Sequence, residues 1–292
     1  MIKTYVYGRT LAMPARRFIQ CDVFSPLPTQ GNGLAVIVDA EGLSDDQMQR
    51  FAAWTNLAET TFLLPPTVPD ADYKVRILTP VREMLFAGHP TLGSCAAWLH
   101  TGGVPKDAQV VRQECGVGIV EIDISQQPPA FVAPPTTVEP MSPQQLAAIV
   151  EVLHIPMSSV LHNAQLNNGP VWQVLHLATA ADVLAVDSSC VRWPVFKSIG
   201  LIGAHEPRAE CDYEVRMLAP SSGMSEDPIT GSLNAALAHW MQAHGRLTSQ
   251  ITIAQGTNIF RHGRVSVRTD NVDGRIFIGG ETHILIEGTV TL

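Results

Sequence analysis

The feature that most constrains the fold is a repeat at about half the length of the 292-residue chain. Three pairs of segments match in the same order: Tyr73–Pro80 with Tyr213–Pro220, Pro90–Leu99 with Pro228–Leu237, and Gly118–Ile122 with Gly263–Val267. The first pair reads YKVRILTP and YEVRMLAP, which is typical of a short strand ended by proline. Three matches in one order and at nearly the same spacing indicate duplication of a whole domain.

The repeat predicts two matching domains, each a strongly curved sheet wrapped around a central helix. The runs Ala96–Leu99 and Ala235–Ala238 carry no charge, as expected of helices buried on every side. We expect these helices to begin at Pro90 and Pro228, because proline suits the first helical turn.

Two amphipathic stretches, Asp45–Leu57 and Pro143–Leu153, predict outer helices with one solvated face. A proline-rich stretch, Gln126–Pro135, favours extended backbone and indicates the domain boundary. The predicted units are residues 1–132, residues 133–278, and a C-terminal segment of residues 279–292 that can return to the first domain.

The composition favours a small-molecule ligand and excludes a typical nucleic-acid-binding surface. The chain has 27 acidic and 19 basic residues, whereas nucleic-acid binders usually concentrate Lys and Arg on one face. It has no run of 18 apolar residues and no secretory signal pattern, so we expect no membrane partner and a cytoplasmic location. Five cysteines without a CxxC spacing favour buried free thiols: Cys21, Cys95, Cys115, Cys190 and Cys211.

Candidate site residues lie beside the two predicted helix starts and at the start of one strand. Gly88–His89 precedes one helix and Glu226–Asp227 the other, where backbone N–H groups and the positive dipole end suit a carboxylate. Glu59 enters a strand amid apolar neighbours, and burial would raise its pKa toward values useful for proton transfer. Each residue also has a purely structural interpretation. Glu59 can be held by hydrogen bonds, His89 can have both ring nitrogens hydrogen-bonded, and Asp227 can cap the following helix.

Three strings together closely resemble the signatures of the PhzF phenazine-biosynthesis-like family: Asn56–Phe62 (NLAETTF), Phe86–Gly93 (FAGHPTLG) and Glu226–Ser232 (EDPITGS). The resemblance runs from about Arg17 to the C-terminus. The resemblance implies a diaminopimelate-epimerase-like α+β fold of two pseudo-equivalent domains, each a curved, barrel-like, mostly antiparallel sheet around a central helix. It also implies a homodimer. Family members of known activity isomerise a dihydro-hydroxyanthranilate without metal or cofactor, so the resemblance implies a cofactor-independent isomerase that acts on a small carboxylic acid.

The resemblance also assigns roles, position by position. The glutamate matching Glu59 would shuttle a proton between carbon atoms, and His89 and Asp227 would hydrogen-bond the substrate and assist proton movement. The implied residues are catalytic Glu59, His89 and Asp227 and substrate-binding Gly88, Gly231 and Ser232.

Two other functions remain open from the sequence. One is an amino-acid epimerase or racemase, although similar enzymes carry cysteines at the positions matching Gly88 and Asp227, so Cys95 or Cys115 would have to supply the thiols. The other is a non-catalytic protein that binds a small acid.

No glycine-rich phosphate signature and no metal-ligand spacing is found, so we expect neither a nucleotide cofactor nor a metal. Gly33, where the family more usually has proline, leaves the fit of any particular substrate open.

Overall fold

The computed structural model describes residues 14–189, 191, 195, 198–220, 224–247, 250–270 and 272–292. The extension before Met13 and the thiol of Cys190 lie outside these residues. In the described part, Cys21, Cys95, Cys115 and Cys211 are buried free thiols, as predicted. None of the described helices is both long and apolar enough to span a bilayer.

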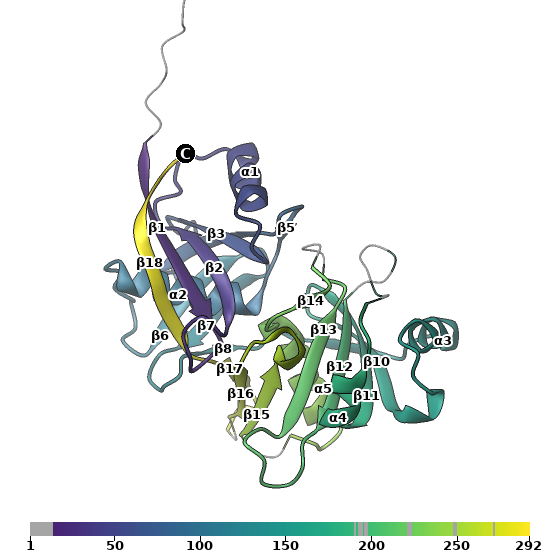
Figure 1. Cartoon of the computed structure of the whole chain (residues 1–292). Coiled ribbons are helices and arrows are strands. Elements are labelled where there is room, and N and C mark those ends of the chain that lie inside the picture. The colour runs from purple at the N-terminus through teal and green to yellow at the C-terminus, as the bar shows by residue number, and fades with distance from the viewer. Residues whose placement is uncertain are drawn as a thin grey trace, which may run out of the picture.

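The first half of the chain builds a curved sheet with one helix inside and one outside (Figure 1). Its helices are α1 (Asp45–Thr55) and α2 (Gly88–His100). Its strands are β1 (Ala15–Val23), β2 (Asn32–Ile37), β3 (Glu59–Leu64), β4 (Tyr73–Leu78), β5 (Glu83–Met84), β6 (Val110–Cys115), β7 (Gly118–Asp123) and β8 (Ala130–Val132).

The second half repeats this plan with additions. Its helices are α3 (Pro143–Val152), α4 (Ala180–Ala185) and α5 (Gly231–Ala243), with short 3₁₀ turns at Met157–Ser159 and Thr257–Ile259. Its strands are β9 (Thr137–Glu139), β10 (Val160–Asn167), β11 (Val171–Thr179), β12 (Ile199–Ala204), β13 (Tyr213–Leu218), β14 (Glu226–Asp227), β15 (Ile251–Gln255), β16 (Gly263–Thr269) and β17 (Ile276–Gly279). The last strand of the chain is β18 (Thr282–Thr291).

The two halves pair their strands in the same order. In each half the first pair is antiparallel (β1–β2, β10–β11), the second parallel (β2–β3, β11–β12) and the third antiparallel (β3–β4, β12–β13). The fourth strand then pairs with a two-residue strand and, in parallel, with the sixth (β4–β5 and β4–β6, β13–β14 and β13–β15). This correspondence confirms the predicted α+β fold of two pseudo-equivalent units, and the sheet is curved rather than closed.

Two pairings join the halves into one sheet. β8, inside the proline-rich stretch, pairs with β17, with Phe131 opposite Ile278. β18 returns to pair antiparallel with β1, and Figure 1 shows these two strands side by side at the outer edge of the first half. The proline-rich stretch is therefore part of the sheet. The division at residues 132 and 278 into separate units stays a prediction.

The central helices are buried, but they begin elsewhere than predicted. The prediction that they start at Pro90 and Pro228 is wrong: α2 begins at Gly88 and α5 at Gly231. Pro90 fits inside the first turn of α2 because the first N–H groups of a helix have no partner within the helix. Pro228 lies outside α5 because Glu226 and Asp227 are still paired with β13. The repeat in the sequence aligns Gly93 with Gly231. The helix starts show instead that Gly88 is the structural counterpart of Gly231.

The outer helices confirm the sequence prediction and show why they start where they do. Ser44 caps α1 with a reciprocal capping box to Gln47, and Asn56 ends the helix in the left-handed region with φ 54°. Ser142 caps α3 and is followed by Pro143 at the first helical position. α1 lies between β2 and β3, and the shorter α4 takes the same place between β11 and β12.

Candidate active site

The starts of the two central helices touch each other. A Cβ atom added to Gly88 would lie 2.6 Å from the Cα atom of Gly231, and one added to Gly231 would lie 3.0 Å from the Cα atom of Gly88 and 2.8 Å from the Phe24 ring. Only glycine fits at either position, because real side chains do not approach backbone so closely. Two positive helix ends, each with unpaired first-turn N–H groups, therefore converge at the boundary between the halves.

Glu59 and His89 face each other beside this contact. Glu59 is the first residue of β3 and His89 the second of α2, and Glu59 Oε2 lies 3.5 Å from His89 Nε2. The histidine side chain is 3% exposed and the glutamate 16% exposed, so the pair opens to solvent on the glutamate side. Among the described residues, neither of these two atoms has a hydrogen-bond partner. Buried polar atoms without partners are rare and call for an explanation.

Asn32 of β2 connects the two halves of the site. Its Nδ2 donates to the Asp227 carboxylate (3.2 Å) and to the Ile229 carbonyl (2.9 Å), and it lies 3.3 Å from His89 Nδ1. Because an amide nitrogen only donates, we assign His89 Nδ1 as the acceptor in this contact and the ring proton to Nε2, with the two Nδ2 hydrogens shared among three acceptors. Burial lowers the pKa of His89 to about 3, so the ring is neutral near pH 7. His89 consequently directs a neutral N–H group toward Glu59.

Asp227 is held by a network of buried polar groups. The Thr230 hydroxyl donates to Asp227 Oδ2 at 2.5 Å, and the Gln255 amide donates to that hydroxyl (2.9 Å) and to the Asp227 carbonyl (3.3 Å). Burial raises the pKa of Asp227 to about 6, although the hydrogen bonds from Thr230 and Asn32 act in the opposite direction. Asp227 can therefore exchange a proton near neutral pH.

The two carboxyl groups influence each other. The pKa of Glu59 is raised well above its usual value, first by burial and then by the negative charge of Asp227, while the positive charge of Arg82 opposes the rise. A carboxyl group with a raised pKa retains its proton toward neutral pH, which suits general acid/base catalysis. The structure thus places two carboxyl groups and a neutral imidazole at one junction.

The remaining predicted residues lie in the same place. Gly88, Gly231 and Ser232 are buried at the two helix starts, and the Ser232 carbonyl accepts a hydrogen bond from Asn168 Nδ2 at 2.8 Å. All six residues named from the sequence are therefore gathered at one junction, and the role of each stays a prediction. Within the described residues, no group of three His, Cys, Asp or Glu side chains is close enough to hold a metal ion.

The cysteines are poorly placed for a two-thiol mechanism. Cys95 lies along α2, away from its first turn, and burial raises its pKa to about 12. Burial also raises the pKa of Cys115. Both thiols therefore stay protonated at neutral pH, whereas the thiolate is the reactive form. A cysteine at position 88 would in turn collide with Gly231.

Sequence reasoning missed the residues that organise the site. Asn32 directly precedes Gly33, the departure from the family pattern, and Thr230 stands inside the string EDPITGS, but neither residue carries a sequence signal of its own. Gln255 ends a short apolar strand and is completely buried, so a polar residue at the end of such a strand is the only sequence signal it carries. Its contacts to Thr230 and Asp227 depend on the tertiary structure.

Comparison with known proteins gives a consistent family. The model of the phenazine biosynthesis-like protein family (PhzC-PhzF) matches residues 21–288. A Schizosaccharomyces pombe protein named Antisense-enhancing sequence 1 is 33% identical, covering 94% of this chain and 99% of its own length. Trans-2,3-dihydro-3-hydroxyanthranilate isomerase of Pseudomonas aeruginosa is 32% identical, covering 89% of this chain and 92% of its own length.

Solved structures agree on the fold. A PhzF-family protein of Bacillus anthracis superposes with a TM-score of 0.80 at 21% identity, covering 96% of this chain and 100% of its own. A hydroxyproline epimerase of Agrobacterium vitis superposes with a TM-score of 0.66 at 12% identity, covering 96% of this chain and 92% of its own. At these identities the likeness concerns the architecture alone.

Proposed function

Because the chain belongs to the phenazine biosynthesis-like (PhzF) family, we propose that it is an isomerase that moves a proton, and with it a double bond, within a small carboxylic acid. Relatives with a named activity are isomerases, which supports the reaction class. In the proposal Glu59 is the acid/base, His89 and Asp227 bind and assist, and Gly88, Gly231 and Ser232 bind the carboxylate.

One observation carries the proposal more than any other. Glu59 Oε2 and His89 Nε2 face each other at 3.5 Å and have no hydrogen-bond partner among the described residues. Leaving two such groups buried and unpaired costs stability, so a bound substrate is the natural partner for both. The raised pKa of Glu59 and the neutral state of His89 suit a proton carrier beside a hydrogen-bond donor.

The proposed steps balance without a further reactant. The Glu59 carboxylate removes a proton from one carbon of the substrate as the double bond shifts, and the resulting carboxylic acid returns that proton to another carbon. His89 Nε2–H donates a hydrogen bond to the substrate, and the Asp227 carboxyl group binds an amino or hydroxyl group. The N–H groups at the starts of α2 and α5 hold the substrate carboxylate.

The first test uses trans-2,3-dihydro-3-hydroxyanthranilate, the compound in the name of one relative, in D₂O. We expect the wild-type protein to convert it, with deuterium incorporated to the extent that the proton on Glu59 exchanges with solvent before its return, and Glu59→Gln to be slower by about 10²–10⁴-fold, as for other general acid/base residues. Glu287→Gln, at an exposed pair with His100, is the matched control and should keep full activity. Equal rates for wild type and Glu59→Gln would refute the role of Glu59.

The dependence of kcat/KM on pH tests the charge of the site. Glu59 must be ionised to accept a proton, so activity should rise with pH through a midpoint above the usual glutamate range. Asp227→Asn removes the negative charge that raises the pKa of Glu59, so the midpoint should move to lower pH even where the maximum rate falls. An unmoved midpoint would contradict the coupling between the two carboxyl groups.

Two other outcomes separate the alternatives. Loss of activity in a Cys95→Ala, Cys115→Ala double variant would favour an epimerase that uses thiols, whereas we expect full activity. Tight binding of the acid without conversion or deuterium exchange would favour a binding protein. We also propose a homodimer, as the family resemblance implies, and a cytoplasmic location, as expected from the sequence pattern, and sedimentation of the purified protein tests the first.

A further inference from the structure

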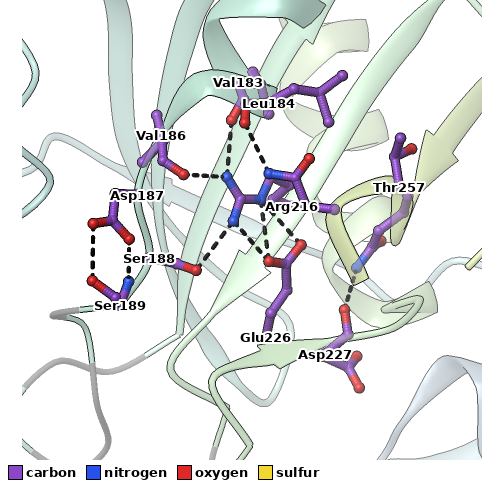
Figure 2. Close-up of polar contacts among 12 residues, drawn as sticks. Val183, Leu184, Val186, Asp187, Ser188, Ser189, Arg216, Glu226, Asp227 and Thr257 are labelled. Carbon is purple, nitrogen blue, oxygen red and sulfur yellow. Dashed lines mark hydrogen bonds and ion pairs between the residues drawn. The ribbon is translucent and has the colours of Figure 1, made fainter. Parts of the chain in front are cut away.

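Arg216 of β13 uses every N–H group of its guanidinium in a buried cluster beside the proposed site. Its Nε and Nη2 atoms donate to the Glu226 carboxylate at 2.8–3.2 Å, and Nη2 also donates to the Ser188 hydroxyl at 3.1 Å. Its Nη1 atom donates to the carbonyls of Val183 (3.1 Å) and Val186 (2.7 Å). Figure 2 shows Arg216 at the centre of these contacts.

The pair is almost completely enclosed. The side chains of Arg216 and Glu226 are 2% and 1% exposed. Burying two charges carries a desolvation penalty, and an apolar pair of similar volume often gives equal or greater stability. The pair is therefore poorly explained by stability alone, and its position suggests a different role.

Glu226 is the residue directly before Asp227, and together they make up the two-residue strand β14. Their partners on β13 are Leu218 and Met217. Successive side chains of a strand point to opposite faces, so Glu226 reaches Arg216 while Asp227 reaches Asn32 and Thr230. In Figure 2 the two carboxylates leave β14 in different directions.

The equivalent pair in the first half lies at the surface. Arg76 on β4 binds Glu83, which stands opposite Leu78 as Glu226 stands opposite Leu218. These side chains are 22% and 43% exposed. The residue after Glu83 is Met84, which is apolar. The arginine–glutamate pair is therefore buried only in the second half, where the glutamate is followed by the carboxylate of Asp227.

We propose that the Arg216–Glu226 pair is a positioning element for Asp227, holding the two-residue strand β14 to β13 and to segment 183–188 so that the Asp227 carboxylate meets Asn32 and Thr230. The expected change in kcat rests on the proposed function, whereas the expected change in the position of the Asp227 carboxylate does not. The ionisable groups near Asp227 on neighbouring elements are Glu59 on β3 and His89 on α2, and Glu226 on its own strand acts through its charge.

The decisive readout needs no substrate. The carboxyl carbon of Asp227 is followed by ¹³C NMR in protein labelled at aspartate, and its signal is assigned by its loss in Asp227→Asn. Arg216→Lys keeps both charges of the pair but loses the fork to Glu226 and the bonds to segment 183–188, so weaker hydrogen bonds from Asn32 and Thr230 should raise the titration midpoint of Asp227 by about half a pH unit or more. An unchanged midpoint overturns the proposal.

A second variant guards against poor folding of the first. The double variant Arg216→Met, Glu226→Leu replaces the charges by apolar side chains and should keep the wild-type melting temperature or exceed it. We expect its Asp227 signal to broaden or move, and its kcat on trans-2,3-dihydro-3-hydroxyanthranilate to fall about tenfold or more with less change in KM. A folded double variant with the wild-type Asp227 signal and kcat overturns the proposal.

The matched control is Arg76→Met, Glu83→Leu in the first half. It removes the same pair from the same strand positions and should leave the Asp227 signal and kcat unchanged. An equal effect from this control would show a general loss of sheet stability and would overturn the specific role. If the wild-type protein does not convert the compound while Arg216→Lys raises the Asp227 midpoint, the proposed substrate fails and the positioning role stands.

Discussion

The same arginine–glutamate pair occurs in both halves of the molecule with opposite environments. In the first half, Arg76 binds Glu83 and also Asp45, which is 88% exposed at the start of α1. In the second half, segment 183–188 covers Arg216 and encloses its bond to Glu226. Both halves therefore keep the strand and the arginine–glutamate pair. The neighbouring element decides whether the pair is a surface contact or a buried ion pair.

The candidate catalytic groups are divided between the halves in a similar way. The first half supplies Glu59 and His89, whose facing atoms are unpaired among the described residues. The second half supplies Asp227, which is held by Thr230 and Gln255. The first half therefore presents polar atoms without hydrogen-bond partners among the described residues, and the second half presents a carboxyl group already held by hydrogen bonds.

The largest expected effect is on the free energy of unfolding when the arginine is removed from each arginine–glutamate pair. Arg216→Met leaves Glu226 buried without its cation and should lower the free energy of unfolding by about 3–5 kcal/mol. Arg76→Met removes an exposed contact and should lower it by about 1 kcal/mol or less. Urea unfolding of both variants measures the difference, and similar losses would show that the two environments are not energetically distinct.

A smaller effect is expected where the halves meet and resemble each other. Gly88→Ala forces a Cβ atom against the backbone of Gly231 and should cost about 1–3 kcal/mol, with a similar loss for Gly231→Ala. Gly33→Ala in β2 is the control, since its Cβ would lie 3.7 Å from Leu57, an ordinary contact. A neutral Gly88→Ala would show that the helix starts have room to separate.

The smallest effect is a pH-dependent change in stability at Glu59. The folded-state pKa of Glu59 is raised, so the folded protein binds that proton more tightly than the unfolded chain, and stability falls as pH rises through this range. Glu59→Gln removes this loss and should raise the melting temperature at pH 8, with little change at pH 4. Thermal unfolding at the two pH values tests it, and an increase only at pH 4 would reverse the assignment.

Residue patterns in the sequence predicted the architecture, and together with the family resemblance they named the residues of the candidate site. The repeated YxVRxLxP segment, the apolar central helices and the cap at Ser142 are local features, and the structure confirms the elements they predict. The helix starts were misplaced because proline at position 90 is compatible with several positions in a first turn. The register of β14 with β13, which excludes Pro228 from α5, is a long-range property that the sequence does not display.

What the sequence determined by itself is therefore the plan: two copies of one α+β unit, and the residue types Glu, His and Asp in three separate strings. What only the tertiary structure decided is their state. Asn32 joins Asp227 across 195 positions of sequence separation, and burial raises the pKa of Glu59 and lowers that of His89. Topology follows from patterns repeated along the chain, whereas pKa values and hydrogen-bond partners follow from distances between atoms that only folding brings together.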